Sequence, residues 1–173
     1  MAAGIIASVL IAITGYLAQI AFFPAMGAIA VGPNMILAVT VVFGMIYGPW
    51  PAISMAFFGG IMVDFMAGGA IGISSLVPLI AGFFLGILRR ELNSTHFAWA
   101  MIFSAVANLL NDLWMIITMY FARIDVYIGW GTLLRSILSA VETAVFAGLI
   151  FLIVSKVLSI GEKRSGLPYL QRY

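Results

Sequence analysis

Six long apolar runs occupy almost the whole of this 173-residue chain, and only short connections separate them. Hydrophobic residues make up 64% of the sequence and charged residues 8%, which is far outside the range of soluble globular proteins. A helix needs about 20 residues to cross about 30 Å of hydrocarbon, so the length accommodates roughly six spans. The sequence therefore predicts an all-α integral membrane protein, built as a single bundle of about six transmembrane helices.

Proline and glycine residues between the runs set the expected boundaries of the spans. The first run has no basic residue ahead of it, so we expect a true span rather than a cleaved signal peptide. Pro33 suits the first turn of the second span, and the Pro49-Trp50-Pro51 turn is expected to end it. Gly68, Gly69 and Gly72 then break the helix before the fourth span. The expected spans are residues 4–23, 34–48, 51–66, 73–88, 97–121 and 129–154.

Basic residues fall mainly on one side of this predicted bundle. Short loops rich in lysine and arginine stay in the cytoplasm. With an even number of spans, the connection after the fourth span and the basic tail 155–173 lie on the same side. We therefore expect both termini in the cytoplasm, with the tail near anionic lipid headgroups. Six of the eight basic residues lie on that side: Arg89, Arg90, Lys156, Lys163, Arg164 and Arg172.

Four ionisable residues lie inside the apolar runs, namely Asp64, Asp112, Arg135 and Glu142. A helix rises about 1.5 Å per residue, which puts Asp64, Asp112 and Arg135 at roughly one level in the outer half of the bundle. Glu142 lies two turns deeper, on the same helix face as Arg135. A charge inside the membrane costs about 2.5 to 3.5 kcal/mol, so each is expected to face the interior and find a partner. We expect Arg135 to pair with Asp112 or Asp64.

Asn108, Asn111 and Asp112 share one stripe of the fifth span, because their spacing of three and four residues puts them on one helix face. One interpretation of these polar groups is an ion or proton path, or a substrate site. The other is an internal clamp that fixes how the helices dock, because buried polar groups need partners in any case. A proton path normally needs a continuous line of titratable groups, and below Glu142 the sixth span is apolar. The clamp is therefore the favoured interpretation.

Small residues recur at every fourth position in three of the expected spans, the spacing that lets helix backbones approach closely. Packing within the chain is the simpler explanation. The alternative is docking of a partner's transmembrane helix, for which the first span is the expected face because a terminal helix often has few neighbours. The small pairs are Gly44 and Gly48, Ala56 and Gly60, and Gly82 and Gly86.

The residues that commonly carry enzyme chemistry are scarce. The chain has no cysteine, and its one histidine, His96, is expected at the cytoplasmic interface. No second histidine, cysteine or carboxylate pair stands at a metal-ligand spacing. Ser74 and Ser75 follow a glycine-rich break but have no base near them in sequence. The sequence thus predicts a protein that is not an enzyme and that binds no cofactor or metal.

A proline-initiated helical hairpin in the first half of the chain carries Pro33-Asn34-Met35-Ile36-Leu37, then GMIYGPW from Gly44 to Trp50, then Phe58-Gly59-Gly60 with Asp64, Gly69 and the region of Leu76. These residues resemble the bacterial rod shape-determining protein MreD family. The resemblance covers spans two to four, and spans five and six carry no matching motif. Gly59, Gly60 and Asp64 are the residues carried over by motif. Asp112, Arg135 and Glu142 rest on the physical reasoning above.

This resemblance implies a non-enzymatic scaffold in the bacterial inner membrane, with no nucleic-acid partner. Its expected partners are MreC, bound directly, together with RodA, its cognate penicillin-binding transpeptidase and, indirectly, MreB filaments during lateral peptidoglycan synthesis. The implied fold is similar to the substrate-binding subunits of energy-coupling-factor vitamin transporters. The alternative function is such a vitamin-type binding subunit. In that case the level of Asp64, Asp112 and Arg135 would line an outward-facing cavity, although the outer loops are short and plain.

Overall fold

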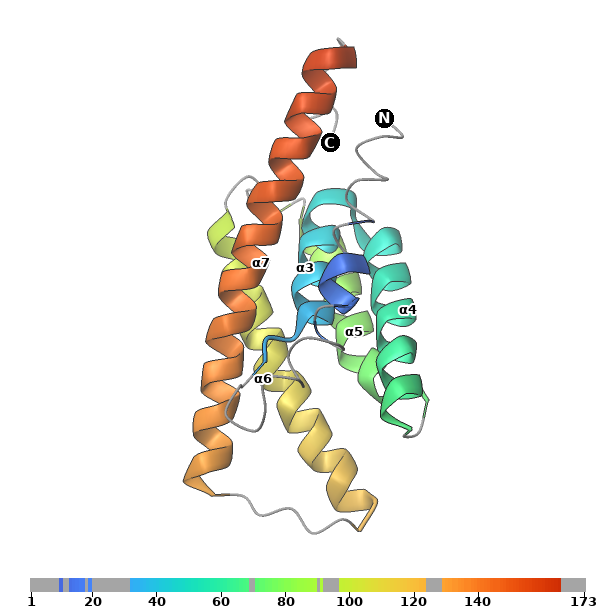
Figure 1. Ribbon diagram of the computed structural model, residues 1–173, viewed down its shortest axis with the longest axis vertical. Coiled ribbons are helices and arrows are strands. Elements are labelled where there is room, and N and C mark those ends of the chain that lie inside the picture. The colour runs from blue at the N-terminus through green and yellow to red at the C-terminus, as the bar shows by residue number, and fades with distance from the viewer. Residues whose placement is uncertain are drawn as a thin grey trace.

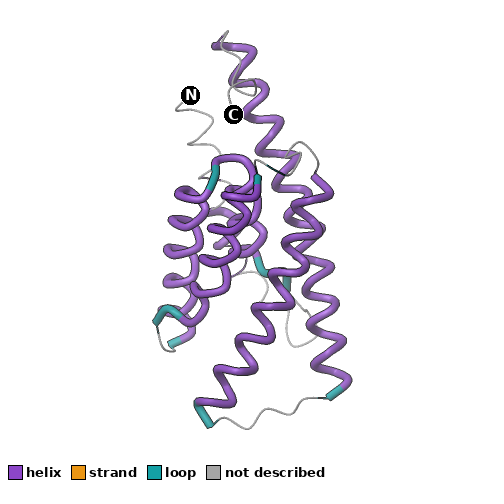
Figure 2. The backbone as a smooth tube through the Cα atoms, turned by 180° about the vertical axis from the view of Figure 1, so that it is seen from behind, coloured by secondary structure: helices purple, strands orange, loops and turns teal. Residues whose placement is uncertain are grey.

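A computed structural model of the chain describes residues 10, 13–17, 19, 32–68, 71–89, 91, 97–123 and 129–165. Throughout those ranges the regular structure is helical and no strand occurs. Residues 13–17 are helical, and five further helices follow along the chain (Figures 1 and 2). They are α3 (Met35–Tyr47), α4 (Pro49–Ala67), α5 (Ile73–Leu88), α6 (Phe97–Phe121) and α7 (Trp130–Ser165).

Three of these helices are long and apolar enough to cross a membrane. The qualifying stretches are Pro49–Met66 in α4, Phe97–Phe121 in α6 and Trp130–Leu158 in α7. The other two, α3 and α5, are shorter apolar helices of 13 and 16 residues. The described part of the chain is therefore all-helical, with the membrane-spanning character that its composition predicts.

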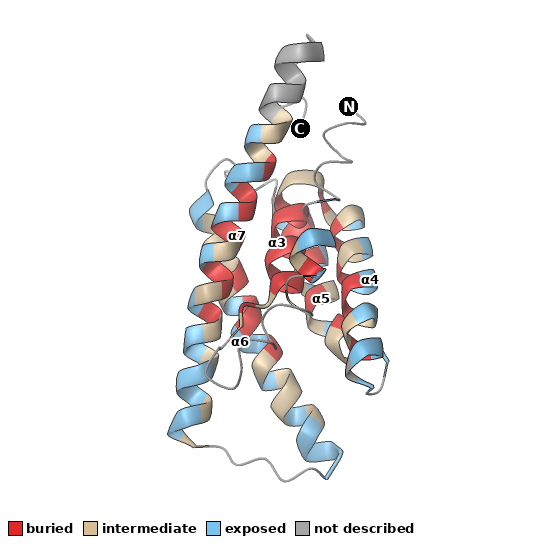
Figure 3. Cartoon of the chain, viewed as in Figure 1, coloured by how far each residue is buried: buried red, intermediate tan, exposed pale blue. Residues whose placement is uncertain are grey.

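The short helix α3 lies at the centre of the bundle. All eleven residues from Met35 to Met45 are buried, and Figure 3 shows almost the whole helix in the buried colour. It contacts α4, α5, α6 and α7. A helix that is apolar on every side is stable either inside a protein or in a bilayer, and the run MILAVTVVFGMIY has this composition. At 13 residues α3 is shorter than the about 20 that cross the hydrocarbon, so its backbone ends need protein partners rather than lipid.

Glycines permit close helix crossings around α3 and α5. A methyl group added to Gly44 would lie 3.3 Å from the Gly82 carbonyl oxygen, and one added to Gly86 would overlap the backbone of Pro49. A methyl group on Gly60 would likewise overlap Ser75. These contacts confirm packing within the chain as the role of the small residues at 44, 60, 82 and 86.

The hairpin between α3 and α4 differs from the expected one. Gly48 alone makes the turn, with a φ of 95°, a conformation that glycine adopts without steric cost. Pro49 and Pro51 belong to the first turn of α4, where a missing N–H leaves no hydrogen bond unmade. The second span thus ends within one residue of its expected end, but residues 49–51 begin α4 instead of forming the expected turn between the two helices.

Two of the later helices have the predicted boundaries, and one helix extends beyond its predicted end. The expected spans 73–88 and 97–121 coincide with α5 and α6. Helix α7 begins one residue after the predicted start but continues to Ser165, beyond the predicted end at residue 154. The end of an apolar run indicates where the bilayer ends, whereas a helix continues until its backbone hydrogen bonds stop. Most of the expected first span, His96 and residues 166–173 of the tail lie outside the described residues.

We expect Gly86→Ala to lower the stability of the bundle by about 1–3 kcal/mol, because the added methyl group has no space beside Pro49. Gly131→Ala is the matched control, since nothing lies within 4 Å of its added methyl group. Alanine favours a helix over glycine by up to about 1 kcal/mol, so this control should be neutral or slightly stabilising. Thermal unfolding in mild detergent, followed by tryptophan fluorescence, compares the two. Equal melting temperatures would contradict the close α5 contact.

Candidate functional site

A buried polar cluster joins α6 and α7 near the start of α3. Asn108 of α6 and Thr143 of α7 are both buried, with exposed fractions of 1% and 0%. Asn108 Nδ2 donates a hydrogen bond to Ser139 Oγ at 3.2 Å. Thr143 Oγ1 donates to the Ser139 carbonyl oxygen at 2.7 Å and lies 3.4 Å from Asn108 Oδ1. The cluster satisfies polar groups that would otherwise be costly in an apolar interior.

The same cluster holds the N-terminus of α3. The first N–H groups of a helix have no partner within the helix, and the bilayer core offers no water to replace one. Here each of these N–H groups donates to a side-chain oxygen. Ser139 Oγ also donates to the Gly32 carbonyl oxygen at 3.3 Å. The pairs are Asn34 N with Thr143 Oγ1 (2.9 Å), Met35 N and Ile36 N with Gln19 Oε1 (2.8 and 3.2 Å), and Leu37 N with Asn34 Oδ1 (3.2 Å).

Arg89 holds the opposite end of α3. Its Nη1 atom donates to the Ile46 carbonyl oxygen at 3.1 Å, and its guanidinium group lies against Gly48. The sequence predicts Arg89 only as part of the basic cytoplasmic side. The structure adds a second role, because the last carbonyl groups of a helix need donors just as the first N–H groups need acceptors.

Asp64 caps the start of α5. Its side chain is buried, with an exposed fraction of 5%. Oδ2 accepts a hydrogen bond from Gly72 N at 2.6 Å, and Oδ1 accepts one from Ser74 N at 3.2 Å. A carboxylate near a helix N-terminus is favourable because the aligned peptide dipoles make that end positive. Asp64 therefore fixes the connection between α4 and α5.

Gly59 and Gly60 lie on different contact faces of α4. Gly60 faces Ser75 at the start of α5, one turn before Asp64. Gly59 faces the ring of Tyr16, whose carbon Cζ lies 2.9 Å from where a methyl group would stand. The Tyr16 hydroxyl donates to the Met55 carbonyl oxygen at 3.1 Å, which secures the N-terminal helical residues to α4. The three motif residues thus join α4 to α5 and to the N-terminal helical residues around Tyr16.

The expected ion pair between Arg135 and Asp112 or Asp64 is wrong. Asp64 binds backbone N–H groups of α5, and the Asp112 carboxylate interacts with the Ser136 hydroxyl of α7. Within the described part of the chain, Arg135 and Glu142 make no hydrogen bond or ion pair. Arg135 is exposed on α7, where its long side chain can extend toward the lipid headgroups. The two aspartates therefore bind neutral donors, backbone N–H groups and a serine hydroxyl, in place of the expected arginine.

The polar stripe of α6 is nevertheless placed as predicted. Asn108 and Asn111 are buried, and Asp112 is half-buried beside α7. The structure brings Asn108 and Asp112 to α7, and it leaves Asp64 in a separate place at the α4–α5 connection. The single level expected for these residues is therefore two separate sites. Each site holds neighbouring helices together.

Sequence reasoning missed Gln19, Ser139 and Thr143. Gln19 is the one amide in the first apolar run, and an uncharged polar residue in such a run is a usable signal. Ser139 and Thr143 carried no such signal, because hydroxyl side chains in helices commonly bond their own backbone. The cluster can provide hydrogen bonds between helices. No group of three or more metal-ligating side chains comes together in the described ranges.

Comparison with known proteins adds no relative. No protein-family model matches the chain, and no similar protein is found among curated proteins or solved structures. The resemblance to the MreD family therefore rests on the motif residues alone.

We expect Asp64→Ala to destabilise the protein by about 1–2 kcal/mol, as for other lost helix caps. Asp64→Asn should lose less stability, because the amide oxygen of asparagine can still accept a hydrogen bond from Gly72 N or Ser74 N. Peptide-level hydrogen exchange checks the location of the effect. Faster exchange in Asp64→Ala should be confined to the first turn of α5, and unchanged exchange there would refute the cap.

Thr143→Val should cost about 1–3 kcal/mol, because it leaves the Asn34 N–H buried without an acceptor. Thr118→Val is the matched control, since that hydroxyl donates only to the Trp114 carbonyl oxygen one turn back. Thermal unfolding in detergent should show a lower melting temperature for Thr143→Val only, and Thr143→Ser should restore most of it. A similar loss in both valine variants would contradict the tertiary cap.

Proposed function

We propose that this protein is a non-enzymatic membrane scaffold of the MreD type. In this proposal it forms a six-span bundle in a bacterial inner membrane, with both termini in the cytoplasm. It binds MreC and helps to couple MreB filaments to RodA and its transpeptidase during lateral peptidoglycan synthesis. The fold would be similar to the substrate-binding subunits of energy-coupling-factor transporters.

One observation carries the proposal: four polar side chains within the bundle, Asp64, Arg89, Asn108 and Thr143, hold other parts of the bundle. Asp64 caps α5, Asn108 and Thr143 join α6 to α7 and α3, and Arg89 closes the end of α3. A transport pathway or binding pocket instead needs polar groups that are free to exchange partners. A rigid bundle that acts through its outer surface fits the observed use of these groups better.

The short helices α3 and α5 are compatible with a six-span bundle. At 1.5 Å per residue, the 13 residues of α3 extend about 20 Å, which is less than the hydrocarbon thickness of about 30 Å. Irregular backbone at membrane depth is tolerated where protein rather than lipid surrounds it. The helices around α3 provide this cover, and its ends are capped by side chains.

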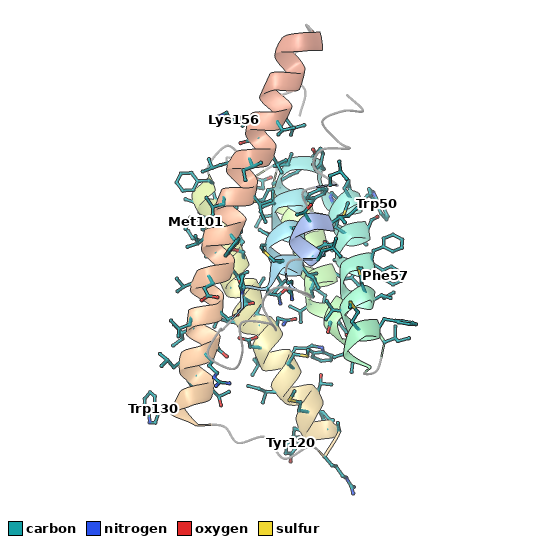
Figure 4. All side chains as sticks on the ribbon, in the orientation of Figure 1. Trp50, Phe57, Met101, Tyr120, Trp130 and Lys156 are labelled. Carbon is teal, nitrogen blue, oxygen red and sulfur yellow. The ribbon has the colours of Figure 1, made fainter. Side chains whose placement is uncertain are left out.

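Aromatic side chains at the two ends of the bundle support the proposed position in the membrane. Figure 4 shows Trp50 near one end of the bundle and Tyr120 and Trp130 near the other. All three are highly exposed. Tryptophan and tyrosine are enriched at both membrane–water interfaces, where the ring is in apolar surroundings and the polar group reaches water.

Affinity purification of the tagged full-length protein from its native membrane in mild detergent tests the proposal. We expect mass spectrometry to recover MreC together with wall-synthesis proteins. Asp64→Asn, which is expected to keep most of the bundle's stability, serves as a control for a folded bait. Recovery of paired ATPase subunits with a coupling membrane protein would overturn the scaffold and favour the vitamin-binding alternative.

A further inference from the structure

One face of α7 carries no other described helix. Its buried residues, among them Thr143, Ala147 and Val154, contact the rest of the bundle. Residues at spacings of three and four on the opposite side are exposed or half-buried. We name this side the α7 outer face, and it consists of Arg135, Leu138, Glu142, Val145, Leu149 and Leu152.

Glu142 is the unexpected member of this face. The apolar stretch Trp130–Leu158 has its midpoint at residue 144, so Glu142 lies about 3 Å from the middle of this stretch along the helix axis. It is half-buried and makes no hydrogen bond or ion pair within the described ranges. Its neighbours Leu138, Val145 and Leu149 are exposed. An ionisable group at this depth normally has a polar partner.

Arg135 extends the pattern toward the outer end of α7. It stands seven residues from Glu142, which is about 10.5 Å along the axis and close to two full turns. Leu138, Val145 and Leu152 repeat at the same interval of seven. Two helices that pack at a small left-handed angle meet at such intervals. A single partner helix could therefore contact both charged residues and Leu138 between them.

The charge pattern excludes a second copy of α7 as the occupant. Two copies inserted in the same direction would place Arg135 against Arg135 and Glu142 against Glu142 when this face packs on itself. Like charges at close range are unfavourable, and most so in a low-dielectric interior. The complementary partner is a different helix, with the opposite order of charges.

We infer that the α7 outer face docks a transmembrane helix of another protein. This helix carries a carboxylate level with Arg135 and a basic side chain level with Glu142. The inference rests on the proposed function, since it names the surface through which the scaffold binds a single-span partner. It also places the partner-binding surface on α7 instead of on the first span. In the first span, Gly15 and Tyr16 already pack against α3 and α4.

Site-specific photo-crosslinking in native membranes tests this surface. The full-length tagged protein carries a photoreactive phenylalanine at Leu149, or at Ile80 of α5 as the matched control, because both side chains are 49% exposed. We expect Leu149 to crosslink to one transmembrane span with the stated charges, identified from the crosslinked peptide, and Ile80 to give no such product. Crosslinks to lipid alone, to a second copy or to a span without these charges would overturn the inference.

A charge substitution tests the electrostatic part separately. Glu142→Gln should reduce the co-purified partner by about tenfold or more, because it leaves a basic group of the partner unpaired at membrane depth. Ile80→Gln is the control, as it adds the same amide to an exposed position on α5, outside this face. Equal losses in both variants would overturn the pairing at Glu142.

The two proposals fail in different ways. If the unmodified protein recovers no single-span partner, the scaffold proposal itself is wrong. If a partner is recovered but crosslinks from Ile80 rather than Leu149, only the α7 outer face is wrong.

Discussion

The bundle depends on a short helix whose two ends are sealed inside the protein. Helix α3 is buried on all sides, so its terminal N–H and C=O groups have no access to water. Side chains from distant parts of the chain supply the missing partners: Gln19 and Thr143 at the start, and Arg89 at the end. Each of these bonds ties another segment to α3. The central helix therefore positions the segments around it.

The start of α5 is also capped by a side chain from another helix, here a carboxylate. Asp64, at the end of α4, accepts hydrogen bonds from the first N–H groups of α5. Gly60 lies one turn earlier, and its lack of a side chain lets Ser75 approach. A cap and a close contact on one helix face together fix both the position and the rotation of α5 against α4. The motif that resembles the MreD family thus has a structural role that can be stated in physical terms.

Some elements followed directly from local sequence, and others could not. Helices α5 and α6 match the expected spans because glycine, arginine and aromatic residues mark their ends in sequence. The end of α7 was misplaced because hydropathy falls at residue 155 while the backbone continues as a helix. The pairing of Arg135 with an aspartate was wrong because opposite charge indicates only that a pair is possible. Rotation of the helices placed backbone N–H groups and a serine hydroxyl beside the aspartates instead.

The sequence by itself determined that this protein is helical and membrane-spanning in character, and that glycine-bearing helix faces pack closely. These properties depend on composition and on spacing within one helix, which are local quantities. The tertiary structure alone decided which polar groups bind each other. Asn34 and Thr143 are 109 positions apart, and their hydrogen bond exists only because α7 lies beside α3 at one rotation. A hydrogen bond requires two atoms within about 3 Å, and no local pattern in a sequence determines that distance.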